Sequence, residues 1–351
     1  MTELAISAPA AIDARKKTAS RIFLGALLFN AALTVFWLSA MARGQASAFS
    51  HGYQVDGAAV GRVVSGILFF YVIWGLIWWG VKSVLLTRVA GFTPEDRRAA
   101  FSSRMDRPYD VPALVSRYSE RRIRIVDMIG RRGRFITLAA ASVYYLYLQI
   151  LQNPQNDFAM GFIQDNLFDA VVTGWVFLGV YYLNGWIGAV FYGPQSRVMD
   201  GVLARANCLL ITTLWAGFKF IMVPVGAHLA AVFPRQEFAP VFAMIWGSYI
   251  ANDTCAEVFG SLLGRQKIKV WGVGDVNRKS VAGLVAGFLG AFVLCAGVVA
   301  SQHLGASWYG LSLVIAVSTS FFELYSPRGT DDFTMATANA LICWAFGAWV
   351  R

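Results

Sequence analysis

Two acids, Asp253 and Glu257, stand four residues apart near the end of an apolar stretch of the chain. In a helix both acids share a face with Ala256 and Gly260, because side chains three, four and seven residues apart point the same way. Charged side chains are costly inside a membrane and usually serve binding or catalysis there. Two carboxylates beside small residues leave room for a ligand and suit Mg²⁺, which combines oxygen ligands with substrate phosphates. The alternative, a structural pairing with Lys or Arg of another helix, stays open.

Further polar residues mark the ends of the next three apolar stretches. Lys279 and Ser280 precede one of them, where the free N–H groups and dipole of a helix start favour phosphate. Glu323 ends the following stretch, and Asp331 with Asp332 begins the last one. We predict that these residues reach the same membrane face as Asp253 and Glu257. The alternatives are the ordinary basic bias of cytoplasmic loops and, for the two aspartates, capping of a helix start.

The elements that position these residues are predicted to be transmembrane helices. The chain of 351 residues is 57% hydrophobic and only 14% charged, more apolar than a soluble protein needs. Several apolar runs reach about 20 residues, the length at which a helix crosses a bilayer core. We therefore predict an all-α polytopic membrane protein with about nine transmembrane helices, at residues 21–42, 60–86, 135–152, 168–192, 208–233, 239–260, 281–301, 307–325 and 333–350.

Cysteine and histidine offer little other chemistry. The four cysteines lie far apart in apolar segments and in no CxxC spacing, so we expect buried free thiols. The three histidines are scattered, which argues against Ser-His and metal-His chemistry. The basic N-terminus before an apolar run resembles a signal peptide, but the run from Ile22 to Ala40 is longer than a signal core and favours a retained anchor.

The distribution of Lys and Arg orients the predicted helices. Basic residues crowd the N-terminus, the segment 88–134 and the loop 261–280, whereas the intervening loops carry few. The positive-inside rule places the crowded segments in the cytoplasm, and every polar residue named above then reaches the cytoplasmic face. We predict an integral protein of a bacterial cytoplasmic membrane with its active site facing the cytoplasm. The predicted regions are a cytoplasmic tail at 1–20, an N-terminal transmembrane region at 21–206 and a C-terminal transmembrane catalytic region at 207–351.

The segment 88–134 holds twelve arginines against six acids. Within it, Asp110 followed by Val111 and Pro112 predicts a helix start, and apolar residues as far as Ile129 fall on one face. One interpretation is a helix on the inner leaflet whose arginines contact anionic lipid headgroups. The other is an ordinary basic loop of membrane topology. Both interpretations stay open.

Residues 245–340 resemble the CTP-binding region of a superfamily of membrane enzymes, whose motif reads D-x2-A-x3-G-x3-G and then K-K-T/S-x-E-G. The matching run here is Asn252-Asp253-x-x-Ala256-x-x-x-Gly260-x-x-x-Gly264, followed by Arg278-Lys279-Ser280-x-x-Gly283. Ala282 stands where the motif has glutamate. The segment from Glu323 to Asp332 resembles the kinase branch of the superfamily, with Asp332 in place of its asparagine.

The kinase branch comprises dolichol, phytol and diacylglycerol kinases. The resemblance implies transfer of the γ-phosphoryl of CTP to a membrane lipid alcohol, with Mg²⁺ as cofactor. Together with the residue patterns above, it assigns catalysis to Asp253, Lys279 and Asp332. It assigns nucleotide binding to Asn252, Ala256, Gly260, Gly264, Arg278, Lys279 and Ser280, and metal binding to Asp253, Glu257, Glu323, Asp331 and Asp332.

Two other functions stay open at this point. The same superfamily contains phosphatidate cytidylyltransferases, which make CDP-diacylglycerol from CTP, although their C-terminal motif is absent here. A non-enzymatic transporter or lipid-binding membrane protein would use the charges structurally. The expected partners are CTP and a lipid alcohol or phosphatidate, together with anionic headgroups. No nucleic-acid partner is expected, and the oligomeric state is left open.

Overall fold

The computed structural model describes residues 9–42, 57–104, 106, 109–152, 158–183, 185–268, 279–326 and 330–350. Every secondary-structure element within these ranges is a helix. Lys267 and Ser280 form an isolated antiparallel β-bridge. The prediction of an all-α fold is therefore confirmed.

The chain divides into two compact units, and three of the described helices cross from one unit into the other. The boundaries fall at Phe135 within α7 (Glu120–Gln152) and at Ala216 within α10 (Ala204–Val232). A third boundary, at Phe168, divides α8 (Phe158–Val180). The second unit thus also takes parts of α7 and α8, which the predicted division at residues 206 and 207 assigned to the N-terminal region.

Several helices lie wholly within the first unit. They are α1 (Pro9–Ala42), α3 (Gly57–Ile67), the π-helix η1 (Leu68–Ile73), α4 (Trp74–Arg88), α5 (Pro94–Ser102), α6 (Val111–Arg117), α9 (Gly185–Tyr192) and the 3₁₀-helix η2 (Val198–Leu203). Buried apolar side chains of α4, α5, α6 and α7 form one core cluster, in which Leu86, Phe101, Leu114 and Ile123 are nearly inaccessible.

The predicted helix at 168–192 is interrupted. α8 ends at Val180, and α9 begins at Gly185, whose φ of +76° suits glycine. The buried guanidinium of Arg205 donates from Nη1 to the carbonyls of Tyr181 and Leu183, at 2.8 and 3.0 Å. These bonds satisfy carbonyls that a helix end leaves unpaired, so the prediction of one continuous helix here is wrong.

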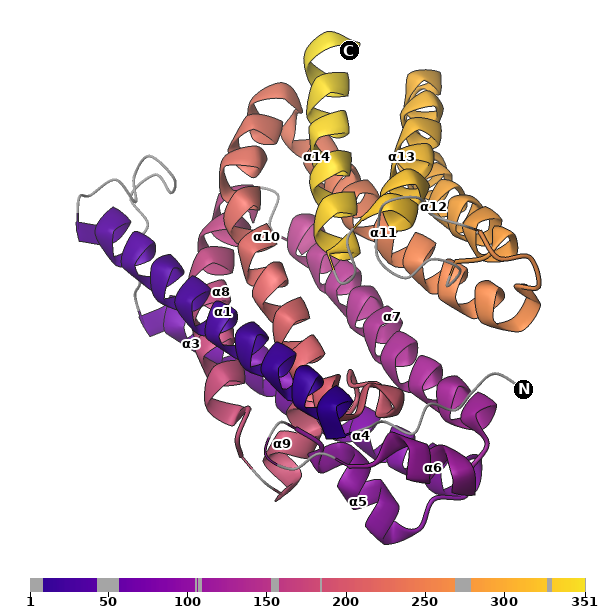
Figure 1. Ribbon diagram of the computed structural model, residues 1–351. Helices are drawn as coiled ribbons and strands as arrows, with labels where there is room; N and C mark the ends of the chain where they lie inside the picture. The colour runs from indigo at the N-terminus through magenta and orange to yellow at the C-terminus, as the bar shows by residue number, and fades with distance from the viewer. Residues whose placement is uncertain are drawn as a thin grey trace. The chain divides into compact units, whose positions relative to one another are not determined.

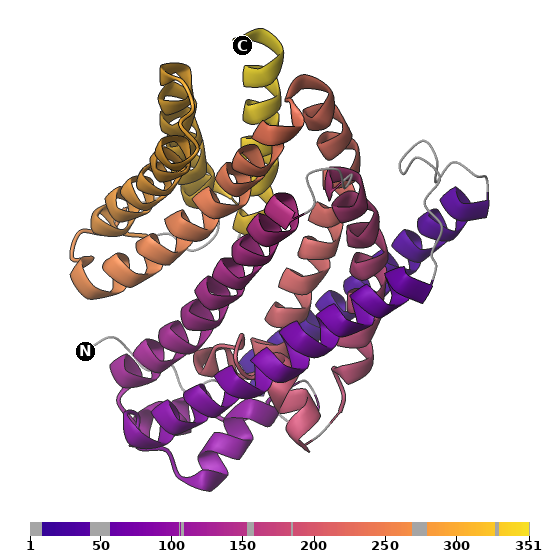
Figure 2. The same ribbon diagram turned by 180° about the vertical axis from the view of Figure 1, so that it is seen from behind.

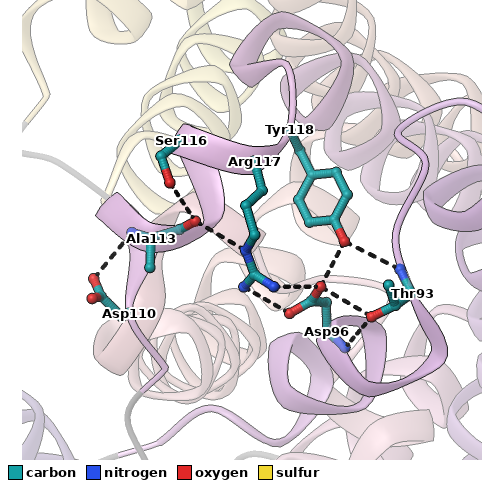
Figure 3. A network of polar contacts seen from close by, with 7 residues as sticks. All are labelled: Thr93, Asp96, Asp110, Ala113, Ser116, Arg117 and Tyr118. Atoms are coloured by element: carbon teal, nitrogen blue, oxygen red, sulfur yellow. Dashed lines mark hydrogen bonds and ion pairs between the residues drawn. The ribbon is translucent and has the colours of Figure 1, made fainter.

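The predicted surface helix from Val111 to Ile129 is also broken, between α6 and α7. Figure 3 shows the network beside the break. The carboxylate of Asp96 accepts two hydrogen bonds from Arg117, at 3.1 and 2.9 Å, and one from the hydroxyl of Tyr118 at 2.6 Å. Tyr118 is the extended C-cap of α6. This network therefore anchors the end of α6 to the start of α5.

Another basic side chain of the first unit, Lys82, is fully buried. It forms an ion pair with Asp127 at 2.9 Å and donates to the carbonyls of Gly193 and Ser196, just beyond α9. Asp127 in turn accepts a hydrogen bond from the backbone N–H of Val198 at 2.7 Å. Several charges of this unit therefore hold irregular backbone in place.

Five helical segments among the described residues are long and apolar enough to cross a membrane. They are Ile12–Ser39, Val63–Arg88, Val198–Gly217, Val281–Ser301 and Ala306–Tyr325. Their length and composition support a membrane-embedded helical protein.

The second unit contains the four C-terminal helices that carry the predicted site. They are α11 (Arg235–Leu263), α12 (Val281–Ser301), α13 (Ala306–Tyr325) and α14 (Asp331–Trp349). α12 packs along α11 and against α13, while α14 contacts α13 and α11. Figures 1 and 2 show α11 and α12 side by side from opposite directions. Because the chain reverses at each connection, the ends of α11 and α13 meet the starts of α12 and α14.

Candidate metal and phosphate site

Three carboxylates meet where α13 ends and α14 begins, beside α11. Asp253 of α11, Glu323 of α13 and Asp331 of α14 each place a carboxylate oxygen so that all three lie within 4.8 Å of one another. Asp253 is 9% exposed and Glu323 is 5% exposed. The three residues come from three different helices, so the packing of the unit assembles the cluster. Hard oxygen ligands at this separation are suited to a divalent cation such as Mg²⁺.

Lys279, directly before the cap of α12, lies against this cluster. Its ammonium forms an ion pair with Oε1 of Glu323. The second oxygen, Oε2, is buried and has no hydrogen-bond partner within the part of the chain that the structure describes. A buried polar atom without a hydrogen-bond partner is costly, and a divalent cation bound to Oε2 would relieve that cost.

The backbone around Lys279 is fixed on both sides. The N–H of Ile268 donates to the carbonyl of Lys279 at 2.9 Å, and the N–H of Val281 donates to the carbonyl of Gln266 at 3.1 Å. Burial acts to lower the pKa of Lys279, but the Glu323 carboxylate and then Asp253 and Asp331 more than offset it, so the pKa is raised. The ammonium is therefore charged and held at the edge of the carboxylate cluster.

Ser280 serves the helix start directly. Its hydroxyl accepts a hydrogen bond from the N–H of Gly283 at 3.2 Å, which makes it the N-cap of α12. The same hydroxyl lies 3.2 Å from where a Cβ on Gly260 would stand and 2.5 Å from where one on Gly264 would stand. Ser280 and these glycines therefore form the close packing of α11 against α12.

The small residues of the motif share this packing role. A Cβ on Gly283 would come within 2.8 Å of the carbonyl oxygen of Ala256. The space beside Ala256 and Gly260, which the sequence suggested for a ligand, is thus taken by α12. Their predicted part in nucleotide binding stays a prediction, and what the structure gives them is a close helix contact that brings Lys279 to the carboxylates.

Asn252, next to Asp253, is 1% exposed. Its Nδ2 donates to Oγ of Ser320 on α13 at 2.9 Å, within the helix unit. Its side chain also lies against Gly287 of α12, where a Cβ would come within 3.0 Å of Oδ1. Asn252 therefore joins α11 to α13 and packs against α12, next to Asp253.

The other predicted site residues lie apart from the cluster or outside the description. Glu257, one turn beyond Asp253, is partly buried and is not one of the three clustered carboxylates. Asp332 lies in the first turn of α14, but its side chain is outside the described residues, and Arg278 is outside them altogether. The predicted roles of Asp332 and Arg278 remain predictions.

Several buried polar residues deeper in the unit were not predicted from the sequence to belong to the site. All are at most 8% exposed, and they are Ser248, Ser312, Thr319, Ser320 and Asn339. Asn339 donates through Nδ2 to Oγ of Ser248 and to Oγ1 of Thr319, at 2.9 Å each. The signal in the sequence was their helical spacing within apolar stretches: Thr319 and Glu323, and likewise Ser248 and Asn252, are four residues apart.

The arrangement combines a negatively charged ligand set with one cation at a helix start. Carboxylates can hold Mg²⁺, and an ammonium beside them can contact the phosphate oxygens that such a metal also binds. Comparisons with protein-family models, with curated proteins and with solved structures found no match to this chain. The assignment of function therefore depends on the site itself and on the motif resemblance.

Proposed function

We propose that this protein is an integral membrane kinase that transfers the γ-phosphoryl of CTP to a lipid alcohol of the polyprenol, phytol or diacylglycerol type. The observation that carries the proposal is the convergence of Asp253, Glu323, Asp331 and Lys279, with Oε2 of Glu323 buried and without a hydrogen-bond partner among the described residues. The motif resemblance supplies CTP as the donor and the lipid alcohol as the acceptor.

The charges of the site suit phosphoryl transfer. Asp253, Glu323 and Asp331 would hold Mg²⁺, and the bound cation would supply positive charge to stabilise the negative charge that develops on the phosphoryl group during transfer. Lys279 adds a positive charge for the phosphate oxygens. The oxygen of the lipid hydroxyl forms a bond to the γ-phosphorus, the bond from that phosphorus to the CDP oxygen breaks, and the hydroxyl proton leaves to a carboxylate or to solvent.

The membrane arrangement is part of the proposal. Nine transmembrane helices, with the helix ends that carry the site at the cytoplasmic surface of a bacterial inner membrane, would expose the site to CTP and to a lipid hydroxyl at the headgroup level. The apolar faces of α12 and α13 support insertion of these two helices in a bilayer, since Val285, Val293 and Val317 are each more than half exposed. Arginines of α5 to α7 would face anionic headgroups on the same side.

The test is CTP binding by the purified full-length protein in detergent or nanodiscs, with and without Mg²⁺. We expect saturable CTP binding that needs Mg²⁺ and is lost in Asp253→Asn. A transporter or structural lipid-binding protein has no reason to bind CTP in this way. Absence of Mg²⁺-dependent CTP binding in the wild type would contradict both the kinase and the related cytidylyltransferase function.

A further inference from the structure

Two buried asparagines form hydrogen-bond bridges between the helices that carry the carboxylates. Asn252 of α11 reaches Ser320 of α13 at 2.9 Å, and Asn339 of α14 reaches Ser248 of α11 and Thr319 of α13 at 2.9 Å each. Asn252 is 1% exposed and Asn339 is fully buried. Such bonds inside a membrane bundle specify partners, because an unmatched polar group there is costly.

Each bridge shares a helix with a carboxylate of the cluster. Asn252 directly precedes Asp253, and Ser320 lies one turn before Glu323 on the same helix. On α14, Asp331, Met335 and Asn339 are spaced four residues apart, so they lie on one face. A bridge that fixes the rotation and axial position of a helix thereby fixes the position of its carboxylate.

We propose that Asn252 and Asn339 are positioning residues that set the register of α11, α13 and α14 and so hold Asp253, Glu323 and Asp331 at cation-binding distance. The inference rests on the proposed metal site, and it assigns Asn252 a role through Ser320, separate from nucleotide contact. Small residues bring α11 close to α12. The asparagine bridges join α11, α13 and α14, so they set the register among the helices that carry the three carboxylates.

The experiment measures binding of Mn²⁺, as a probe for Mg²⁺, to purified full-length protein in nanodiscs by electron paramagnetic resonance. Ser320→Ala removes the acceptor of Asn252, and we expect Mn²⁺ affinity to fall roughly 10- to 100-fold, as for other groups that orient metal ligands. Ser312→Ala is the matched control. Ser312 is equally buried on α13, but its hydroxyl donates to the carbonyl of Trp308 in the same helix at 2.9 Å.

Three further variants separate positioning from general damage to the fold. Ser320→Cys keeps the shape of the side chain but accepts hydrogen bonds weakly, so it should lose affinity too, whereas Ser320→Thr keeps the hydroxyl and should bind like the wild type. Asn339→Ala should weaken Mn²⁺ binding as Ser320→Ala does. Maximal turnover at saturating Mn²⁺ should be recovered in all of them, because the ligands themselves remain.

The outcomes are distinct. Equal affinity in Ser320→Ala and the wild type, or an equal loss in Ser312→Ala, would overturn the positioning role while leaving the metal site in place. A wild type that binds no Mn²⁺ would overturn the metal site and the proposed function together with this inference. Binding that depends on Ser320 and Asn339 but not on Ser312 supports it, whether or not CTP is the donor.

Discussion

Lys279 and Glu323 form an ion pair across two helices: the lysine directly precedes the cap of α12, and the glutamate lies in the last turn of α13. The lysine side chain is 37% exposed, whereas the glutamate side chain is only 5% exposed. The pair thus joins a partly exposed ammonium, which a phosphate can reach, to a buried carboxylate. One oxygen of that carboxylate faces Lys279, and the other has no hydrogen-bond partner among the residues that the structure describes.

Lys279→Ala should separate the binding of CTP from the binding of the metal. Loss of the ammonium removes one contact to phosphate, so the KM for CTP should rise roughly tenfold, as for a lost hydrogen bond to a charged group. The affinity for Mn²⁺ should be unchanged or higher, because no cation then competes for Glu323. Both constants can be measured on the same preparation. Arg265→Ala is the control, because Arg265 is an exposed residue just beyond α11. Equal losses of CTP affinity in the two variants would show that the loop binds CTP through its overall positive charge and not through a specific site at Lys279.

Asp253→Asn should abolish turnover while leaving the protein folded. The amide keeps the size of the side chain but removes a metal-binding charge, and such losses typically cost several kcal/mol of transition-state stabilisation. Glu257→Gln is the matched control on the same helix, because Glu257 lies outside the three-carboxylate cluster. Steady-state kinetics at saturating Mg²⁺ check the prediction. Wild-type turnover in Asp253→Asn would make the residue a structural buried acid.

Gly283→Ala should destabilise the second unit. The added methyl would meet the carbonyl of Ala256 at 2.8 Å, and overpacking of this kind typically costs about 1–3 kcal/mol. Gly297→Ala on the same helix meets no atom within 4 Å and should be neutral or slightly stabilising. Thermal unfolding in detergent compares them. Equal melting temperatures for the two variants would contradict the close packing of α11 and α12.

The Asp96 network predicts a pH-dependent stability of the segment that links α5 and α6. Hydrogen bonds from Tyr118 first, then Thr93 and the charge of Arg117, hold the pKa of Asp96 below its ordinary value despite partial burial. A carboxyl with a lowered folded pKa stabilises the fold above its ordinary pKa, and this contribution is lost as pH falls through the lowered value. Protection of α5 and α6 from hydrogen exchange, corrected for intrinsic rates, should therefore fall in acid.

Two variants test the origin of that dependence. Asp96→Asn should lose protection at neutral pH and show little further change in acid, because the ionised partner of Arg117 is gone. Glu95→Gln, at the exposed neighbouring position, should behave like the wild type. If both variants kept full protection and the same pH dependence, Asp96 would not be the group that links α5 to α6.

Much of the second unit was predictable from the sequence because its helices are uniform apolar runs with polar ends. The predicted helix at 281–301 coincides with α12, and the one at 307–325 differs from α13 by one residue. Lys279 and Ser280 mark a helix start in both sequence and structure. The sequence predicted only that Asp253 and Glu323 lie at the same face of the membrane. The structure shows that their carboxylate oxygens lie within 4.8 Å of each other.

The remaining features depend on residues far apart in the sequence. The break between α8 and α9 is stabilised by Arg205, which follows it by more than twenty residues. The apolar pattern alone therefore predicts one continuous helix here. The bridges from Asn252 and Asn339 join residues on different helices, and no local spacing identifies such partners. The glycines of the motif suggested open space, whereas helix packing fills it.

The most direct test of the central claim follows the phosphorus atoms of CTP. Membranes or nanodiscs that hold the protein, with Mg²⁺ and a prenyl alcohol or diacylglycerol, would receive CTP labelled at the γ-phosphate and, separately, at the α-phosphate. Asp253→Asn provides the matched control. The account predicts γ label in the extracted lipid, no α label, release of CDP, and loss of all lipid label in the variant. Lipid labelled only from the α-phosphate, with phosphatidate as acceptor and pyrophosphate released, would contradict the kinase assignment, and lipid labelled from neither position would contradict phosphoryl transfer altogether.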